Sequence, residues 1–339
     1  MSAGEIVQCA VYRNHGDFVA RATIEPSIRE ILMQKRILLV VTLVIASFAT
    51  LRAQQVADPN FNPRIDHPQY TANGGPTVML DEAHFNFHTV EGRYKPFAEL
   101  LRRDGYRVLP FRDKFSRDSL KGLQILVIAN ALAERNQQDW SLPNPSAFTD
   151  EEIKAVEQWV KGGGSLMLIA DHMPMSGAAE KLGAAFGARW NNGFAMIENA
   201  RGPMIFKRSD GSLASHPITD GRTIDERIDE AATFTGSAFQ VGREARPLFV
   251  FGNDVISLMP VVAWEFKPDT PRVSVKGWCQ GAALRHGKGR VALFGEAAMF
   301  SAQLAGANAQ PVGMNAPVAR QNYQLLLNTL HWLSGLMKE

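Results

Sequence analysis

Cysteine is nearly absent from this sequence, and its scarcity removes several kinds of site. The 339 residues include only Cys9 and Cys279, which are too few for a zinc site built from cysteine. If the N-terminal segment is removed, as argued below, Cys279 has no partner and no intramolecular disulfide can form. No cysteine follows the apolar N-terminal run to accept a lipid anchor.

Motifs for common cofactors and nucleophiles are missing as well. No G-x-G-x-x-G or phosphate-binding loop follows the first predicted strand, which argues against a dinucleotide or nucleoside triphosphate site. There is no G-x-S-x-G elbow, so no motif marks Ser176 or Ser301 as a nucleophile. No basic run or Arg-rich stripe occurs after residue 53, and we therefore expect no nucleic acid partner.

The hydrophobic run near the N-terminus is too short for a comfortable membrane anchor. Residues 37–51 are uncharged and mainly apolar, whereas a spanning helix needs about 20 such residues. Lys35 and Arg36 precede the run and small residues occur up to Ala53, which is the pattern of a secretory signal peptide. We expect a signal peptide at about residues 33–53 to be cleaved off. The mature protein would then be periplasmic or secreted, and only this segment would contact the membrane. An uncleaved anchor or a buried helix is the alternative.

The segment before the hydrophobic run shows no clear pattern, and Met33 would be an ordinary start. Our hypothesis is that residues 1–53 comprise a mis-started preface followed by the signal peptide. Without them the chain keeps 30 basic and 30 acidic residues, so its net charge is close to zero. The remainder, about 286 residues, is long enough for one large domain or a domain with an insertion.

Strand and helix patterns alternate after an extended leading segment at residues 54–75. The predicted strands are 77–80, 106–111, 123–130, 165–171 and 290–295, and the predicted helices are 94–105, 149–161, 177–186 and 318–337. Thr149 and Glu152 fit a capping box at the start of the second helix. The alternation predicts an α/β fold, with a mostly parallel sheet and helices on both faces.

The middle of the chain departs from this alternation. Residues 76–339 are expected to form a single domain with a β-rich insertion at about residues 190–275. Short β-like pieces occur there among Gly, Pro and Asp, at 203–206, 246–252, 261–266 and 271–278. The Trp- and Phe-bearing part of this region could present a surface to a partner.

Acidic and histidine residues follow three of the predicted strands. They are Asp81, Glu82, His84 and His88 after the first strand, Asp171 and His172 after the fourth, and Glu296 after the last. Sites in open parallel sheets form outside the carboxyl ends of the strands, so we expect these side chains to share one rim. We predict that Asp81, Asn86 and Asp171 bind a small polar ligand, for example a glycan fragment.

The same rim could support acid–base chemistry without a metal. Histidine titrates near neutrality and a neighbouring carboxylate can orient it. The candidate catalytic residues are therefore Glu82, His84, His172 and Glu296, and an enzyme of this kind would be a hydrolase. The alternative interpretation is structural, with these side chains capping and tying the strand ends.

A metal site is a further possibility at this rim. His84 and His88 are four residues apart, so one helical turn would place both imidazoles on one face, and His172 would be a third ligand. Imidazole and carboxylate ligands suit zinc or another divalent transition metal. The sequence does not match H-E-x-x-H, and the metal-free interpretation stays open beside this one.

Three segments resemble the class I glutamine amidotransferase-like superfamily. They are "GGGSLMLIADH", "GKGRVALFGEAAMFSAQ" and "NYQLLLNTLHWLSGLM". Within that superfamily the chain most resembles the GIFT-type and related bacterial domains, over roughly residues 76–190 and 286–336. The resemblance implies a flavodoxin-like α/β sheet, which agrees with the pattern of strands and helices.

The resemblance also implies a limit on activity. True amidotransferases of this superfamily place a nucleophilic cysteine in a tight turn after a central strand, whereas the comparable strand here ends in Ala170, Asp171 and His172. Cys279 is not at such a turn, so we expect no glutamine hydrolysis. GIFT-type members include binding and assembly modules, which makes a non-catalytic protein-interaction module the alternative to a ligand-binding domain.

Overall fold

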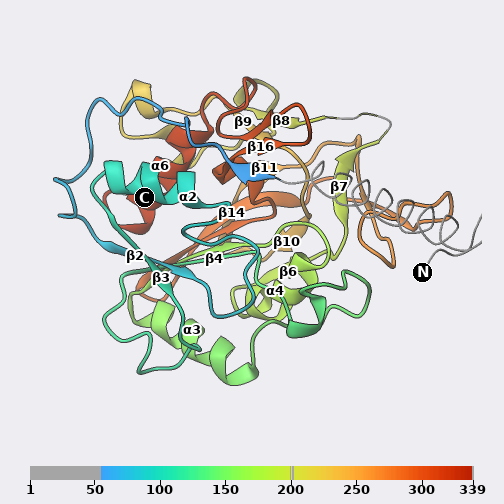
Figure 1. The fold of residues 1–339 in the computed structure, drawn as a ribbon, viewed down its shortest axis with the longest axis horizontal. Helices are drawn as coiled ribbons and strands as arrows, with labels where there is room; N and C mark the ends of the chain where they lie inside the picture. Colours follow the sequence, from blue (N-terminus) through green and yellow to red (C-terminus); the bar gives the residue numbers. More distant parts are fainter. Residues whose placement is uncertain (1–54, 199, 201, 338–339) are drawn as a thin grey trace, which may run out of the picture. The chain divides into compact units, whose positions relative to one another are not determined.

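A nine-stranded sheet forms the centre of the protein. The computed structural model describes residues 55–198, 200 and 202–337, and the fold is mixed α/β (Figure 1). The first five strands in spatial order are β3 (Arg107–Phe111), β2 (Thr77–Asp81), β4 (Ile125–Ala129), β5 (Ser165–Ile169) and β15 (Gly289–Phe294), and all are parallel. They correspond to the five strands predicted from the sequence.

The other half of the sheet is antiparallel, so the sheet is mixed rather than mostly parallel. It continues with β14 (Cys279–His286), β10 (Phe239–Val241) and β6 (Ala188–Trp190), while β11 (Ala245–Val250) also pairs with β14. The turn from His286 to Gly289 is too short for a crossover connection, so β14 and β15 must pair as a hairpin. Part of the predicted insertion thus extends the main sheet.

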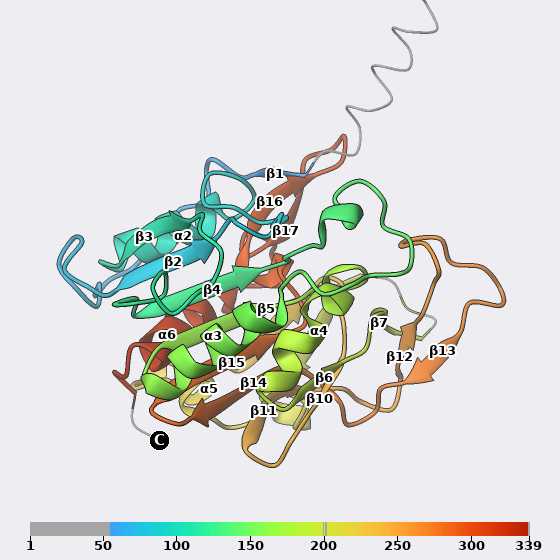
Figure 2. The same cartoon turned by 90° about the horizontal axis from the view of Figure 1, so that it is seen from below.

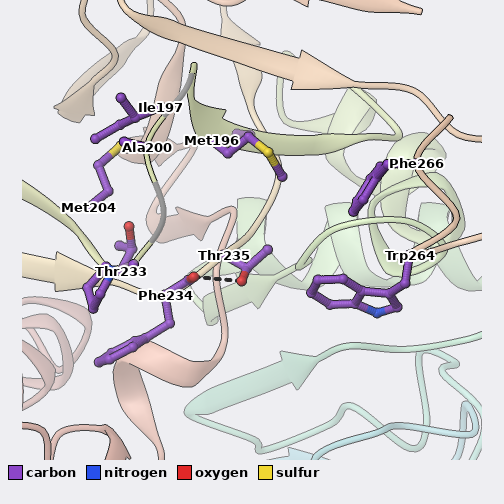
Figure 3. A pocket seen from close by; sticks show the side chains of 12 residues that line it. Met196, Ile197, Ala200, Met204, Thr233, Phe234, Thr235, Trp264 and Phe266 are labelled. Carbon is purple, nitrogen blue, oxygen red and sulfur yellow. Dashed lines mark hydrogen bonds between the residues drawn. The ribbon is translucent and has the colours of Figure 1, made fainter. Parts of the chain in front are cut away.

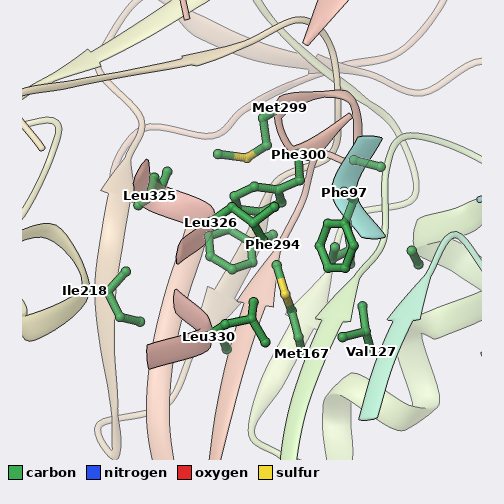
Figure 4. Close-up of a cluster of buried hydrophobic side chains, with 14 of the residues drawn as sticks. Phe97, Val127, Met167, Ile218, Phe294, Met299, Phe300, Leu325, Leu326 and Leu330 are labelled. Atoms are coloured by element: carbon green, nitrogen blue, oxygen red, sulfur yellow. The ribbon is translucent and has the colours of Figure 1, made fainter. Parts of the chain in front are cut away.

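Helices cover both faces of this sheet. Figure 1 shows α2 (Lys95–Arg103) and α6 (Asn322–Leu333) on one side and α3 (Asp150–Gly162) and α4 (Met175–Ala185) on the other. Side chains alternate along β4 because successive residues of a strand point to opposite faces. Val127 joins the cluster under α2 and α6, and Leu126 joins the cluster under α3 and α4. Figure 4 shows the first of these clusters, around Phe97, Phe294 and Leu326.

The helices lie where the sequence predicts them, with shifted ends. The capping box of α3 is present: Thr149 Oγ1 accepts from the N–H of Glu152, and Glu152 accepts from the N–H of Thr149. The helix predicted at 318–337 is shorter, because turns precede Asn322 and Gly335 adopts a φ of 82° beyond the last turn. No helix in the described part of the chain is long and apolar enough to cross a membrane.

Smaller sheets surround the large one. β7 (Phe194–Ile197), β12 (Val255–Leu258) and β13 (Arg272–Ser274) form one, β8 (Met204–Lys207) pairs with β9 (Glu230–Thr233), and β1 (Val56–Ala57), β16 (Ala302–Ala305) and β17 (Gln310–Gly313) form another. Figure 2 shows β7, β12 and β13 beyond the end of the sheet toward which β4 points. The remaining short elements are α5 (Pro217–Asp220), η2 (Glu134–Asn136), η3 (Arg208–Asp210), η4 (Ile224–Glu226) and η5 (Ala298–Phe300).

One predicted β piece is wrong. Residues 261–266 do not form a strand: Val262 makes only an isolated bridge to Ser141, and Trp264 has a φ of 70°. A strand residue needs a strongly negative φ, so the chain turns at Trp264 instead of continuing a ladder.

Candidate functional site

Four of the parallel strands deliver polar residues to one edge of the sheet. β2 ends at Asp81, Asn130 follows β4, Asp171 follows β5 and Glu296 lies just past β15. Because the strands are parallel, these carboxyl ends face the same way. All four side chains are buried, and their hydrogen bonds divide them into separate groups.

The first group surrounds His84, which is completely buried. Its Nδ1 lies 2.9 Å from both carboxylate oxygens of Asp81, and its Nε2 lies 2.9 Å from Glu152 Oε1. The rings of Phe115 and Phe148 pack against it at 4.5 and 4.8 Å. Both ring nitrogens therefore face carboxylates of the same chain, and the ring has no contact with solvent.

Asn86 and Glu82 complete this group. Asn86 Nδ2 donates to Asp81 Oδ2 at 3.0 Å, and Asn86 Oδ1 accepts from the backbone N–H of His84. Glu82 accepts from the N–H of Val90 at 2.9 Å and pairs with the exposed Arg112 at 3.2 Å. Asp81, Asn86 and His84 are thus brought together, and their hydrogen bonds hold the loop that follows β2.

The second group joins His88 to the end of β4. Asn130 Oδ1 accepts from the backbone N–H of Asp171 at 2.9 Å, which leaves Asn130 Nδ2 as the donor to His88 Nδ1 at 3.3 Å. His88 Nδ1 is therefore an acceptor, and the neutral ring carries its proton on Nε2. Burial, with the charge of Arg93, lowers the pKa of His88 to about 3. His88 Nε2 is buried and has no partner in the described part of the chain.

The third group lies between β5 and β15. Both oxygens of Glu296 accept backbone N–H bonds from η5, from Ala298 at 2.9 Å and from Met299 at 2.7 Å. Asp171 accepts from the N–H of His172 and of Ala297. Burial, together with the nearby charge of Asp171, raises the pKa of Glu296 well above its usual range.

The three histidines predicted as metal ligands do not form a common group. Among the residues that the structure describes, no three or more His, Cys, Asp or Glu side chains are placed to hold a metal ion. His84 and His88 lie in a loop rather than on one helical turn, so their spacing of four does not put them on one face.

His172 has different surroundings from the other two histidines. Its Nδ1 donates to the carbonyl oxygen of Met173 at 2.7 Å, so Nε2 is the acceptor of the neutral ring. The ring stacks on Phe194 at 4.3 Å and meets the edge of Trp264 at 4.7 Å. His172 therefore connects the end of β5 to aromatic side chains of the region that follows.

A cavity of about 430 Å³ lies beside these aromatic side chains (Figure 3). Its labelled lining residues are Met196, Ile197, Ala200, Met204, Thr233, Phe234, Thr235, Trp264 and Phe266. We call it the Trp264 pocket. The sequence indicated only that this Trp- and Phe-bearing region could present a surface. No local pattern marks its individual residues, because they come from four separate segments of the chain.

A glycine connects the pocket to the carboxyl edge of the sheet. Gly236 follows Thr235 and accepts from the N–H of Ala195 at 2.8 Å, and Ser237 donates to the carbonyl of Gly295 at 2.7 Å. Gly236 has a φ of 140°, and a Cβ there would lie 2.3 Å from the Gly295 oxygen. Only glycine fits, so the pocket wall passes directly beside the end of β15.

Cys279 is the one cysteine in the described residues, and it begins β14. Burial raises the pKa of its thiol to about 12. A thiol of this kind is not ionised near neutral pH and is a poor nucleophile.

Comparisons with known proteins identify the fold and no activity. No protein-family model and no curated protein matches the chain. Among solved structures, the mmIFT52 N-terminal domain has a TM-score of 0.52 at 13% identity and covers 76% of this chain and 97% of that domain. The similarity shows a shared fold.

Two further solved structures are less similar. A ThuA-like protein from Bacteroides uniformis ATCC 8492 has a TM-score of 0.44 at 12% identity, covering 80% of this chain and 94% of its own. A cytoplasmic protein from Salmonella typhimurium has a TM-score of 0.44 at 13% identity, covering 78% of this chain and 100% of its own. The narrower resemblance to amidotransferase-like and GIFT-type domains stays a prediction from the sequence.

Proposed function

We propose that this protein is a ligand-binding α/β domain with an amidotransferase-like fold and no glutaminase activity, and that its ligand occupies the Trp264 pocket. The observation that carries this proposal is Trp264 itself. Its side chain is half exposed (52%), lines the cavity and is held at a φ of 70°. Tryptophan at positive φ is a rare and strained conformation, which costs about 1–3 kcal/mol and persists mainly at functional sites.

The lining of the pocket defines the chemistry of the ligand. Among the described residues that line it there is no charged side chain, so these residues offer a charged ligand no compensating partner for its lost hydration. The aromatic rings of Trp264 and Phe266 offer flat apolar faces, and Thr233 and Thr235 offer hydroxyl groups. A neutral glycan fragment suits this combination, because a sugar ring has apolar C–H faces and hydroxyls at its edges.

The surroundings of the rim side chains favour a binding function over a hydrolytic one. Glu82, His84 and Glu296, three of the four candidate catalytic residues, are engaged by hydrogen bonds within the chain. His172 is the fourth, and its ring contacts Trp264 of the pocket, whereas Glu296 meets only the backbone of the lining residue Phe234. We assign His172 the role of holding Trp264 in place through ring contact. The rim carboxylates and His84 then fix the loops on which ligand binding depends.

Replacement of Trp264 tests this proposal. The full chain is titrated with a panel of neutral oligosaccharides, using tryptophan fluorescence and isothermal calorimetry. We expect Trp264→Ala to weaken binding at least tenfold, because the main stacking face is lost. The matched control is Ile224→Ala, another exposed apolar residue, which should bind normally. Equal binding by the Trp264 variant, or no response of the native protein to any member of the panel, would contradict the proposal.

A second candidate function is a protein-interaction module. It is favoured by two exposed apolar residues that adjoin each other, Leu142 and Val261, since Leu142 donates its N–H to the carbonyl of Val261, three residues before Trp264. A photoreactive side chain at position 261 would distinguish the two. Crosslinking to one defined protein partner would favour the interaction module, provided that Trp264→Ala abolishes the crosslink and that added sugars do not.

We also propose that the protein acts outside the cytoplasm. The support is the basic pair Lys35 and Arg36 followed by the uncharged apolar run of residues 37–51. These residues lie outside the part of the chain that the structure describes.

A further inference from the structure

Arg93 is a half-buried cation with no anionic partner among the residues that the structure describes. It lies in the loop between β2 and α2, with its guanidinium carbon 3.9 Å from the centre of the Phe87 ring. In the described part of the chain it makes no ion pair and no hydrogen bond, and its Nε is buried without an acceptor. Its terminal nitrogens are not among the buried unpartnered atoms, so they can be approached from solvent.

A second donor without an acceptor lies beside it. The tautomer of His88 is fixed by Asn130, which leaves its buried Nε2–H with no partner. The His88 ring contacts the same Phe87 ring that Arg93 covers, at 5.7 Å between centroids. Two N–H donors from one short loop therefore contact the same aromatic ring, and no acceptor among residues 55–337 that the structure describes satisfies either of them.

The acidic groups of the rim do not neutralise Arg93. Asp81 forms a hydrogen bond with His84, and Asp171 accepts backbone N–H bonds. Glu82 accepts the N–H of Val90 and forms an ion pair with Arg112. Burial lowers the pKa of Arg93, with no carboxylate opposing it. Buried cations and donors are normally paired, so Arg93 and His88 are available to an acceptor that the described residues do not supply.

We propose that Arg93 and His88 form a binding point for an oxyanion, the carboxylate or phosphate-type group of a ligand. The planar guanidinium suits two oxygens of such a group, and the His88 Nε2–H adds a third donor. This point is chemically distinct from the Trp264 pocket, whose described lining residues carry no charge. The proposal does not depend on the ligand of that pocket.

The test is an anion titration of the full chain at constant ionic strength. Phosphate, sulfate, acetate and oxalate are compared with chloride by thermal unfolding and calorimetry. We expect at least one oxyanion to raise the melting temperature by two degrees or more relative to chloride. A response to phosphate and sulfate alone would assign a phosphate-type group, and a response to acetate or oxalate would assign a carboxylate.

Variants separate the site from general salt effects. Arg93→Gln should weaken oxyanion binding at least tenfold, and His88→Gln should weaken it less. Arg117→Gln removes an exposed cation outside this loop and should leave the oxyanion response unchanged, and Trp264→Ala should also keep that response. A response that is identical in the native protein and in Arg93→Gln overturns the proposal.

The native protein supplies an independent measurement if Arg93→Gln does not fold. The Nε–H resonance of Arg93 in a nitrogen-15 spectrum should shift as the oxyanion is added. An unchanged resonance at saturating phosphate and oxalate would overturn the proposal.

Discussion

His84 and His88 are four residues apart and equally hidden from solvent, yet their ring nitrogens meet opposite surroundings. His84 lies between Asp81 and Glu152, whereas His88 meets the amide of Asn130 on one side and, within the described part of the chain, no acceptor on the other. Arg93 adds a like charge next to His88, and the ring of Tyr94 packs on it at 4.5 Å. His88 therefore stays neutral in the folded protein far below the usual range of histidine.

This difference predicts a dependence of stability on pH. The unfolded chain protonates His88 near pH 6.5, while the folded protein does so only at about pH 3. Between about pH 3 and pH 6.5 the unfolded state therefore binds more protons than the folded state. As a result, the free energy of unfolding decreases as the pH falls below 6.5. His216, with a pKa lowered to about 4 by burial, acts in the same direction, and Glu296, with a raised pKa, acts in the opposite one.

The variant His88→Gln isolates this contribution. Urea unfolding between pH 4.5 and 6.5 should show a free energy that depends less on pH than in the native protein, by up to about 1.4 kcal/mol per pH unit. His67→Gln, which changes an exposed histidine, should keep the native slope. If His88→Gln also keeps the native pH dependence of the free energy of unfolding, then His88 is not held neutral in the folded protein.

Local sequence pattern marked polar residues at three strand ends, but not what each of them contacts. The cluster from Asp81 to His88 was visible because its members are adjacent in the chain. Glu152, the second partner of His84, is 68 positions away and was predicted only as a helix cap. Trp264 was assigned to a strand, because an aromatic residue among valines favours β structure and nothing local indicates a positive φ.

At the scale of elements, helix α3 shows how a cap can serve two purposes. Glu152 closes the capping box with Thr149 through one oxygen, and its other oxygen contacts His84 and accepts from the N–H of Phe115. The start of α3 is thereby fixed to the loop after β2. The capping box could be predicted from four residues, whereas the link to the rim could not.

Substitutions in α3 should therefore differ in severity. Thr149→Ala removes one cap bond and should lower the free energy of unfolding by about 1 kcal/mol. Glu152→Ala also leaves His84 Nε2 and the Phe115 N–H unpaired in the interior, and should cost about 2–4 kcal/mol. Glu151→Ala, exposed in the same first turn, should stay within about 0.5 kcal/mol. Equal losses at positions 151 and 152 in urea unfolding would contradict this account.

At the scale of the whole molecule, strand and helix order followed from the sequence, and strand direction followed only in part. The five parallel strands were predicted because helices of sufficient length separate most of them. The antiparallel half was not assigned to the main sheet, because its strands are as short as three residues in β6 and β10. β10 pairs with β14 and β6 pairs with β10, and no local pattern reveals these long-range pairings.

The proposed export of the protein also belongs to the whole molecule. Native material should lack residues 33–53, begin near residue 54 and occur in the extracytoplasmic fraction. N-terminal sequencing and cell fractionation check this expectation. Mature protein that retains the apolar run would support an anchor instead, and peptides from residues 1–32 would refute a start at Met33.

The deep placement of Cys279 has a practical consequence for spectroscopy. A thiol that stays protonated beneath the sheet surface resists maleimide reagents, so protein beginning near residue 54 carries no background attachment point. A cysteine introduced at the exposed Val261 would take a single fluorophore beside the aromatic wall. Ligand binding could then be followed by single-molecule fluorescence without first substituting Cys279.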